Sequence, residues 1–166
     1  MNSQSFPVDF QIRGLRDEAE ARFCAAFVVA SDPWLTLGLT FEQALQRLSD
    51  STREIHVAVV KNQIAGVVIL FLHGTFKGYI QLLAVHPDWR CRGIGTRMIE
   101  WTEERIFSES PNVFLCVSSF NTRAQRFYKR LGYLRVGELP DFVVTGFSEF
   151  LMRKTRGSLR EFKPQG

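Results

Sequence analysis

A strand that runs into a glycine-containing turn and then into a helix is the pattern that most restricts how this chain can fold. Residues Tyr79–Val85 are rich in Val, Leu and Ile, and they end at His86-Pro87. Gly93 and Gly95 follow, and the apolar residues after them recur at helical spacing. Glycines let backbone N–H groups approach a ligand closely, and a helix N-terminus attracts anions. The pattern indicates either a phosphate-binding turn or a tight strand-to-helix connection.

Similar patterns of strands and helices extend over most of the chain, without repeats and without a linker rich in Pro, Gly and Ser. Strands are predicted at Phe10–Leu15, Ile55–Val60, Ile64–Leu72, Tyr79–Val85, Val113–Val117, Tyr133–Val136 and Phe147–Met152. Helices are predicted from Asp17 to the break at Asp32-Pro33, from Thr40 with a capping box to Gln43, from the glycine turn to before Pro111, and from Asn121 to Leu131. This order predicts one α/β domain, in which about four helices flank a mixed, mostly antiparallel sheet of six to seven strands.

Composition argues for a soluble, cytoplasmic protein that acts away from membranes. The 166 residues suffice for a core without disulfides, and the three cysteines show no CxxC spacing, so neither a disulfide framework nor a thiolate zinc site is expected. The longest apolar run, Val67–Leu72, is far shorter than the roughly 20 residues that span a bilayer. Residues 1–10 lack the pattern of a signal peptide.

The net charge of +4 lies at the C-terminal end of the chain. Residues 153–166 contain five basic residues and one acidic residue, whereas residues 1–152 contain equal numbers of each. A basic terminal segment of this kind more often frays in solvent than binds a ligand. We therefore predict a folded domain over 1–152 followed by a flexible basic tail over 153–166, and no nucleic-acid partner.

Two widespread phosphate-binding motifs do not fit the glycine turn. A P-loop requires Lys and then Ser or Thr after its second glycine, where this chain has Thr96 and Arg97. A dinucleotide-binding turn requires a third small residue, where this chain has Met98. Arg90, Arg92 and Arg97 nevertheless place three cations around the turn, which suits a pyrophosphate.

Two motifs resemble those of the GNAT superfamily of N-acetyltransferases. The run Arg90-Cys91-Arg92-Gly93-Ile94-Gly95 is similar to the family's R/Q-x-x-G-x-G/A signature. The run from Asn121 to Tyr133 is similar to N-x-x-A-x-x-F-Y-x-x-x-G-F/Y. A helix and a strand separate the two motifs, as in the family, and the strong resemblance covers Tyr79–Tyr133, about a third of the chain.

The resemblance implies acetyl-coenzyme A as acyl donor and a primary amine as acceptor, with direct transfer in a ternary complex and no metal. It also implies that Tyr128 is the catalytic acid that protonates the departing thiolate. The implied cofactor-binding residues are Leu83, Ala84, Val85, Arg90, Cys91, Arg92, Gly93, Ile94, Gly95, Thr96, Asn121, Ala124 and Tyr128. Helical geometry agrees, because Asn121 and Tyr128 lie nearly two turns apart on one face, with the small Ala124 between them. The alternatives are an ordinary helix N-cap and a surface tyrosine.

The general base is not evident in the sequence. Ribosomal-protein acetyltransferases of the family use a glutamate where this chain has Cys116, and other members use one where it has Gln81. The remaining candidates are Glu54, His56, His73, Asp141 and Glu149, and a chain of water molecules is a further alternative. These departures leave three functions open: acetylation of a small-molecule or peptide amine, acetylation of ribosomal or other protein N-termini, and coenzyme A binding without catalysis.

The acceptor and the assembly state are the least constrained features. Six aromatic residues could line an acceptor pocket or belong to the core, and at helical spacing the core is the commoner outcome. These are Phe23, Phe27, Trp34, Phe41, Phe142 and Phe147. Either a monomer or a homodimer is compatible with the sequence.

Overall fold

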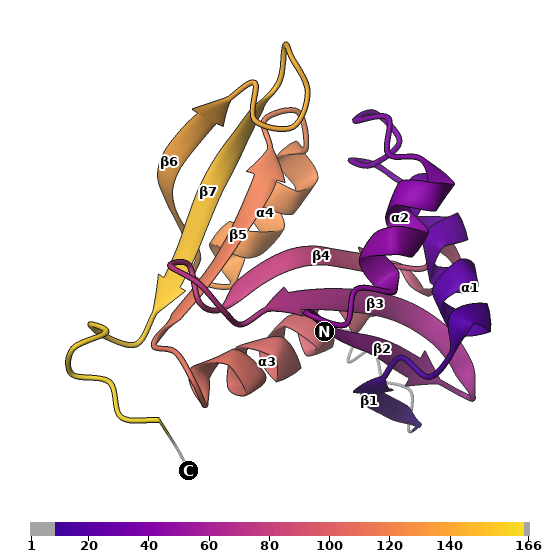
Figure 1. Cartoon of the computed structure of the whole chain (residues 1–166), viewed down its shortest axis with the longest axis horizontal. Helices are drawn as coiled ribbons and strands as arrows, with labels where there is room; N and C mark the ends of the chain where they lie inside the picture. The colour runs from indigo at the N-terminus through magenta and orange to yellow at the C-terminus, as the bar shows by residue number, and fades with distance from the viewer. Residues whose placement is uncertain (1–8, 165–166) are drawn as a thin grey trace, which may run out of the picture.

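A mixed seven-stranded sheet forms the centre of the fold, in the order β1-β2-β3-β4-β5-β7-β6 (Figure 1). The computed structural model describes residues 9–164. The strands are β1 (Phe10–Gly14), β2 (Glu54–Val60), β3 (Gln63–Phe71), β4 (Tyr79–Val85), β5 (Asn112–Ser118), β6 (Leu134–Pro140) and β7 (Ser148–Thr155). The helices are α1 (Glu18–Val29), α2 (Phe41–Leu48), α3 (Ile94–Phe107) and α4 (Thr122–Arg130), with a short 3₁₀ turn at Pro87–Trp89. The predicted α/β fold is therefore confirmed.

Local capping signals begin the first two helices where the sequence predicted them. Asp17 caps α1 by accepting a hydrogen bond from the Glu20 amide at 2.9 Å. At α2, Thr40 Oγ1 accepts from the Gln43 amide at 3.2 Å, and Gln43 Oε1 accepts from the Thr40 amide at 3.0 Å. Reciprocal bonds of this kind satisfy amides that the first helical turn leaves without a partner.

Helices cover the two faces of the sheet unequally (Figure 1). On one face, α1 and α2 pack over β2, β3 and β4, with Val28 and Leu48 in the shared core. On the other face, α3 packs beneath both halves of the sheet, and its Met98 and Ile99 share a core with Leu115 of β5. Helix α4 adds Tyr128 to this second core. No helix within residues 9–164 therefore covers the first face of β5 and β7.

The centre of the sheet is joined by a very short parallel ladder. Strands β4 and β5 pair only at Tyr79 with Phe114 and at Ile80 with Leu115, and they then diverge (Figure 1). Directly after Ile80, Gln81 is an extra residue in the β3–β4 pairing and forms a β-bulge. Because a bulge bends its strand and increases the local twist, it turns β4 away from β5.

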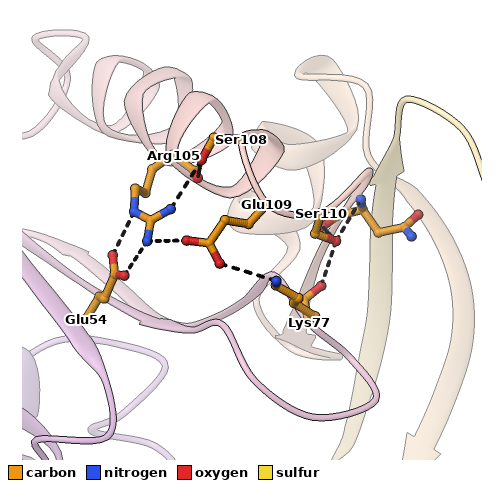
Figure 2. A network of polar contacts seen from close by, with 7 residues as sticks. Glu54, Lys77, Arg105, Ser108, Glu109 and Ser110 are labelled. Carbon is orange, nitrogen blue, oxygen red and sulfur yellow. Dashed lines mark hydrogen bonds and ion pairs between the residues drawn. The ribbon is translucent and has the colours of Figure 1, made fainter. Parts of the chain in front are cut away.

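A chain of charged side chains fixes the C-terminal end of α3 (Figure 2). Arg105 Nε donates to Glu54 Oε2 at 2.9 Å, and its Nη2 pairs with Glu54 and, at 2.7 Å, with Glu109. Glu109 in turn pairs with Lys77 Nζ at 3.3 Å. The network thus connects β2, α3 and the β3–β4 loop at the end of the sheet opposite to where β4 and β5 separate.

Strand β7 changes the boundary predicted for the C-terminal tail. It continues to Thr155, which pairs with Asn112, so residues 153–155 belong to the sheet. Two of the basic residues assigned to the tail have partners here: Arg153 Nε donates to Asn112 Oδ1 at 2.8 Å, and Lys154 Nζ donates to Glu103 Oε2 at 2.6 Å. Residues 1–8, part of the segment expected to lack a signal peptide, and residues 165–166 at the tail lie outside the described residues.

None of the helices within residues 9–164 is long and apolar enough to cross a membrane. Over the same residues, no group of three or more His, Cys, Asp or Glu side chains is placed to hold a metal ion.

Candidate active site

A cleft of about 1080 Å³ opens where β4 and β5 diverge. Its walls come from the end of β4, the turn and first residues of α3, helix α4, and the segment between α1 and α2. The sequence-predicted residues that line it are Leu83, Ala84, Val85, Arg90, Cys91, Gly93, Ile94, Gly95, Thr96, Asn121, Ala124 and Tyr128. The two motifs, separated by a helix and a strand in the sequence, therefore face one space.

The β4 wall offers backbone groups that pair with none of the described strands. The His86 amide donates to Ala65 O of β3 at 2.9 Å, so by strand alternation the backbone groups of Val85 and Leu83 point away from β3. On that side β5 has already separated, since its pairing ends at Ile80. The end of β4 is thus an exposed edge inside the cleft, able to pair with an extended ligand that carries amides.

The turn after β4 places a helix N-terminus without a side-chain cap in the same cleft. Cys91 and Gly93 have positive φ angles of 59° and 76°, which turn the chain sharply into α3. Gly93 is the N-cap and supplies no side-chain acceptor, and the first turn of α3 contains no acidic residue. The first amide of α3 that bonds back to Gly93 is that of Arg97, at 3.1 Å. The preceding amides, including those of Gly95 and Thr96, remain available to an anion.

The predicted arginines do not all point at this anion site. Arg90 Nη2 donates to Ser31 Oγ at 2.7 Å and its Nε donates to Val85 O at 3.1 Å, so its guanidinium bridges two walls of the cleft. Arg92 does not line the cleft, and its guanidinium lies 5.2 Å from the centre of the Trp89 ring. Cationic side chains that the sequence reading missed come from α4. They are Arg123, Arg126 and Arg130, whose spacing of three and four residues places them on one helix face.

Helix α4 carries the two side chains of the second motif. Asn121 is the N-cap of α4, and its Oδ1 accepts from the Ala124 amide at 3.1 Å. Tyr128 lines the cleft but is only 8% exposed, and its ring packs edge-on against Phe127 and Tyr133. Burial raises the pKa of the Tyr128 hydroxyl, so it stays protonated at neutral pH and can donate a proton.

The five candidate bases lie in different parts of the structure and differ in their burial and in their hydrogen-bond partners. Glu54 belongs to the Arg105 network, and the ring of His56 packs at a tilt of 58° against Trp101, with ring centres 4.6 Å apart. Asp141 accepts from the Gly146 amide within an exposed turn, and His73 is exposed in the β3–β4 loop. Glu149 differs from all of these, because it is 5% exposed and accepts from Ser118 Oγ at 2.6 Å.

The two positions where relatives carry a glutamate hold neutral groups with partners of their own. Gln81 Oε1 accepts from Arg53 Nε at 3.0 Å. Burial raises the pKa of the Cys116 thiol, although a hydrogen bond with Tyr79 opposes this. Neither residue is poised to take a proton at neutral pH.

The six candidate aromatic residues divide between the core, the surface and the cleft. Phe27 is buried in the core beneath α1 and α2, as the commoner outcome for such spacing predicts, and Phe41 is half-buried against the same core. Trp34 lines the cleft, and Phe147 packs edge-on against Phe120, which also lines it, at 4.9 Å between ring centres. Phe23 and Phe142 are exposed, at 46% and 60%.

Known proteins with similar sequences and folds agree with this geometry. The acetyltransferase (GNAT) family matches residues 14–133. An uncharacterized N-acetyltransferase of Chlorobaculum tepidum is 25% identical over 99 residues, which cover 60% of this chain and 61% of that protein. The S-(2-succino)cysteine N-acetyltransferase of Bacillus subtilis is 36% identical over 63 residues, covering 36% of this chain and 38% of that enzyme. The alignments thus span less than two thirds of either relative.

Solved structures extend the likeness over nearly the whole fold. An aminoglycoside 6'-N-acetyltransferase crystallised with coenzyme A superposes with a TM-score of 0.69 at 17% identity, over 87% of this chain and 96% of that one. At this identity the likeness concerns the fold alone. Because the family match covers more than half of the residues, including both motifs that face the cleft, the chain belongs to the acetyltransferase (GNAT) family.

Proposed function

We propose that this protein is an acetyl-coenzyme A-dependent N-acetyltransferase that acetylates a primary amine of a small molecule or peptide. One observation carries the proposal: a single cleft joins the strand edge at Leu83–Val85, which pairs with no further strand within residues 9–164, to a helix N-terminus at Gly93–Thr96 that has no side-chain cap. Coenzyme A has an arm with two amides, which suit the strand edge. It also has a pyrophosphate, which suits the helix N-terminus. The coenzyme A complex of the structurally similar aminoglycoside acetyltransferase supports the same donor.

Each part of the donor has a matching wall. The amides of the pantetheine arm would pair with the backbone of Leu83 and Val85, while the pyrophosphate would accept from the amides of Gly95 and Thr96. Arg123 and Arg126 lie on the same cleft and would neutralise phosphate charge. Cys91 and Ala124, small side chains on the lining, leave room for the cofactor to pass.

The reaction would follow direct attack of the amine on the thioester carbonyl. An amide at the end of β4 would stabilise the oxyanion that forms on the carbonyl oxygen. Collapse of the intermediate breaks the C–S bond, and Tyr128 would give its proton to the departing sulfur. No step requires a metal ion.

The acceptor amine is best approached through a defined panel. The relatives named above act on S-(2-succino)cysteine and on aminoglycosides, so these two come first. A polyamine, a free amino acid and a short peptide with an unblocked N-terminus complete the five, and the peptide tests the alternative of protein N-terminal acetylation. We further propose that the protein works in the cytoplasm, since its three cysteines are free thiols and a reducing compartment keeps thiols free. We propose that it does so as a monomer or a homodimer.

Thiol release measured with acetyl-coenzyme A and each panel amine tests the proposal, with calorimetry of coenzyme A binding alongside. We expect acceptor-dependent thiol for at least one amine and acetylated product of the matching mass. Tight coenzyme A binding without acceptor-dependent thiol for any of the five amines would instead favour the non-catalytic binding module.

A further inference from the structure

We propose that Glu149, held in place by Ser118, is the general base that takes the proton from the acceptor amine. The inference rests on the acetyltransferase function proposed above and assigns the step for which the sequence offered no glutamate at either familiar position. Glu149 lies on β7, and its Oε1 accepts a hydrogen bond from Ser118 Oγ of β5 at 2.6 Å.

Glu149 lies on the face of β5 and β7 that none of the described helices covers. Val117 and Leu115 of β5 point into the core beneath α3, so Ser118 and Cys116 point to the other face by strand alternation. Glu149 is the register partner of Ser118 and therefore shares its face. Tyr128, in contrast, belongs to the core on the α3 side. The proton acceptor and the proton donor thus lie on opposite faces of the sheet.

Ser118 and Leu83 lie at similar distances from the point where β4 and β5 separate. The parallel ladder ends at Ile80 and Leu115, and because Gln81 is an extra residue, Leu83 lies two ladder positions along β4, whereas Ser118 lies three residues along β5. Strands rise about 3.3 Å per residue, so the two positions differ by about one residue in their distance from the end of the ladder. Leu83 belongs to the strand edge proposed to hold the end of the pantetheine arm, where the thioester would lie. The cleft residue Phe120 further connects the regions, because it packs on Phe147, two residues before Glu149.

Burial and a single hydrogen bond mark the surroundings of Glu149. Its side chain is buried, only one of its oxygens has a hydrogen-bond partner among residues 9–164, and Ser118 supplies that bond. Burial raises the pKa of Glu149, and the bond from Ser118 lowers it less. The titratable groups that interact with it are Cys116 of the adjacent strand β5 and Tyr79 of β4, and Leu139 is its apolar partner on β6. The charge of Arg47 on α2 lowers the pKa of Tyr79, but Arg47 is not among the causes that shift the pKa of Glu149.

The proton balance closes with these two residues. A protonated acceptor amine gives one proton to the Glu149 carboxylate, which later releases it to solvent. The neutral nitrogen forms the C–N bond as the carbonyl oxygen becomes an oxyanion. When the C–S bond breaks, the sulfur takes a proton from the Tyr128 hydroxyl, and the nitrogen's second proton restores Tyr128. The products are the N-acetylated amine, coenzyme A and one proton.

The test is the pH dependence of kcat/KM for Glu149→Gln, measured by thiol release with whichever of the five panel amines the wild-type protein uses fastest. The amide keeps an acceptor for Ser118 but takes up no proton. We expect kcat/KM at pH 7 to fall about 10²-fold or more, with coenzyme A affinity unchanged. The wild-type profile should rise to a plateau, whereas the variant's should climb steadily toward the pKa of the amine itself and approach the wild type there.

Two further variants sharpen the result. Glu138→Gln makes the same chemical change on the neighbouring strand β6, where Glu138 is exposed and paired with Arg135, and should leave the profile unchanged. Ser118→Ala removes a bond that lowers the pKa of Glu149, so the acidic limb of the profile should move to higher pH. A Glu149→Gln protein with the wild-type rate and profile overturns this inference alone. A wild-type protein that transfers acetyl to none of the five amines instead overturns the function on which it rests.

Discussion

Arg90 and Ser31 are 59 residues apart in the chain, and a hydrogen bond of 2.7 Å joins the Arg90 guanidinium to the Ser31 hydroxyl. The same guanidinium donates to the Val85 carbonyl at 3.1 Å, and the Ser31 hydroxyl donates to Phe27 O at 2.6 Å. One side chain thereby connects the end of β4 to the end of α1 across the cleft. Arg90 also lines the cleft that contains the proposed phosphate site, so its charge can favour an anion there in addition to its structural role.

Arg90→Ala should weaken coenzyme A binding by about 1–3 kcal/mol, because it removes a cation and a charge-assisted hydrogen bond. Ser31→Ala separates the two roles, since it breaks the link at 2.7 Å and leaves the charge. We expect a smaller loss of affinity for Ser31→Ala in titration calorimetry. Equal affinities for both variants and the wild type would exclude Arg90 from the site.

Gly95→Val should weaken coenzyme A binding strongly while the fold persists. A Cβ at Gly95 would lie 3.6 Å from both Phe127 and Val85, which is ordinary contact, so Gly95→Ala fits without displacing protein atoms. The branched methyl groups of valine would extend further and occupy the space that a ligand needs to reach the first turn of α3. Titration of both variants with coenzyme A, with circular dichroism as a check on folding, should show a much larger loss for valine than for alanine.

Tyr128→Phe should lower turnover roughly 10²–10⁴-fold if the hydroxyl is the proton donor, and coenzyme A affinity should change little because the ring is retained. Tyr133→Phe is the matched control. Its hydroxyl is buried without a hydrogen-bond partner among the described residues, and its ring packs edge-on against Tyr128. That variant should keep wild-type turnover. Under conditions where chemistry limits the rate, wild-type turnover in Tyr128→Phe would rule out the acid role.

Arg13 and Glu20 should make stability depend on pH at the acidic end. Two hydrogen bonds of 2.9 and 2.7 Å join their side chains, and Arg13 is the main cause that lowers the pKa of Glu20 from 4.5. The contribution is therefore complete above pH 4.5 and is lost as the pH falls through the lowered pKa. Arg13→Gln should cost about 1 kcal/mol at pH 7 and less at pH 3, as measured by urea denaturation. An equal cost at both values would show that the pair adds no pH-dependent stability.

Local signals in the sequence predicted the helices and strands well. What these signals missed depends on pairing between strands that are far apart in the sequence. The capping box at Thr40 depends on Gln43, three residues away, so it could be read directly. Strand β6 continues to Pro140, although Gly137 and Pro140 read as turn residues, because pairing with β7 outweighs their propensity. Pro140 is tolerated because β6 is an edge strand.

The same distinction applies to the site. The residues of both motifs that face the cleft could be predicted, since their spacing is local. The distinct position of Glu149 could not, because its burial and its bond to Ser118 arise from strand pairing across 31 residues. The link from Arg90 to Ser31 likewise depends on the packing of α1 against the sheet.

The bulge at Gln81 has a consequence for how sequences of related proteins should vary. Gln81 is the extra residue that bends β4 directly after its last contact with β5. Replacing it changes one side chain and one bond to Arg53, whereas deleting it would straighten β4 and let the parallel ladder continue into the cleft. At position 81, the presence of an extra residue therefore matters more than which amino acid it is. Homologues should tolerate many amino acids there and almost no one-residue gaps.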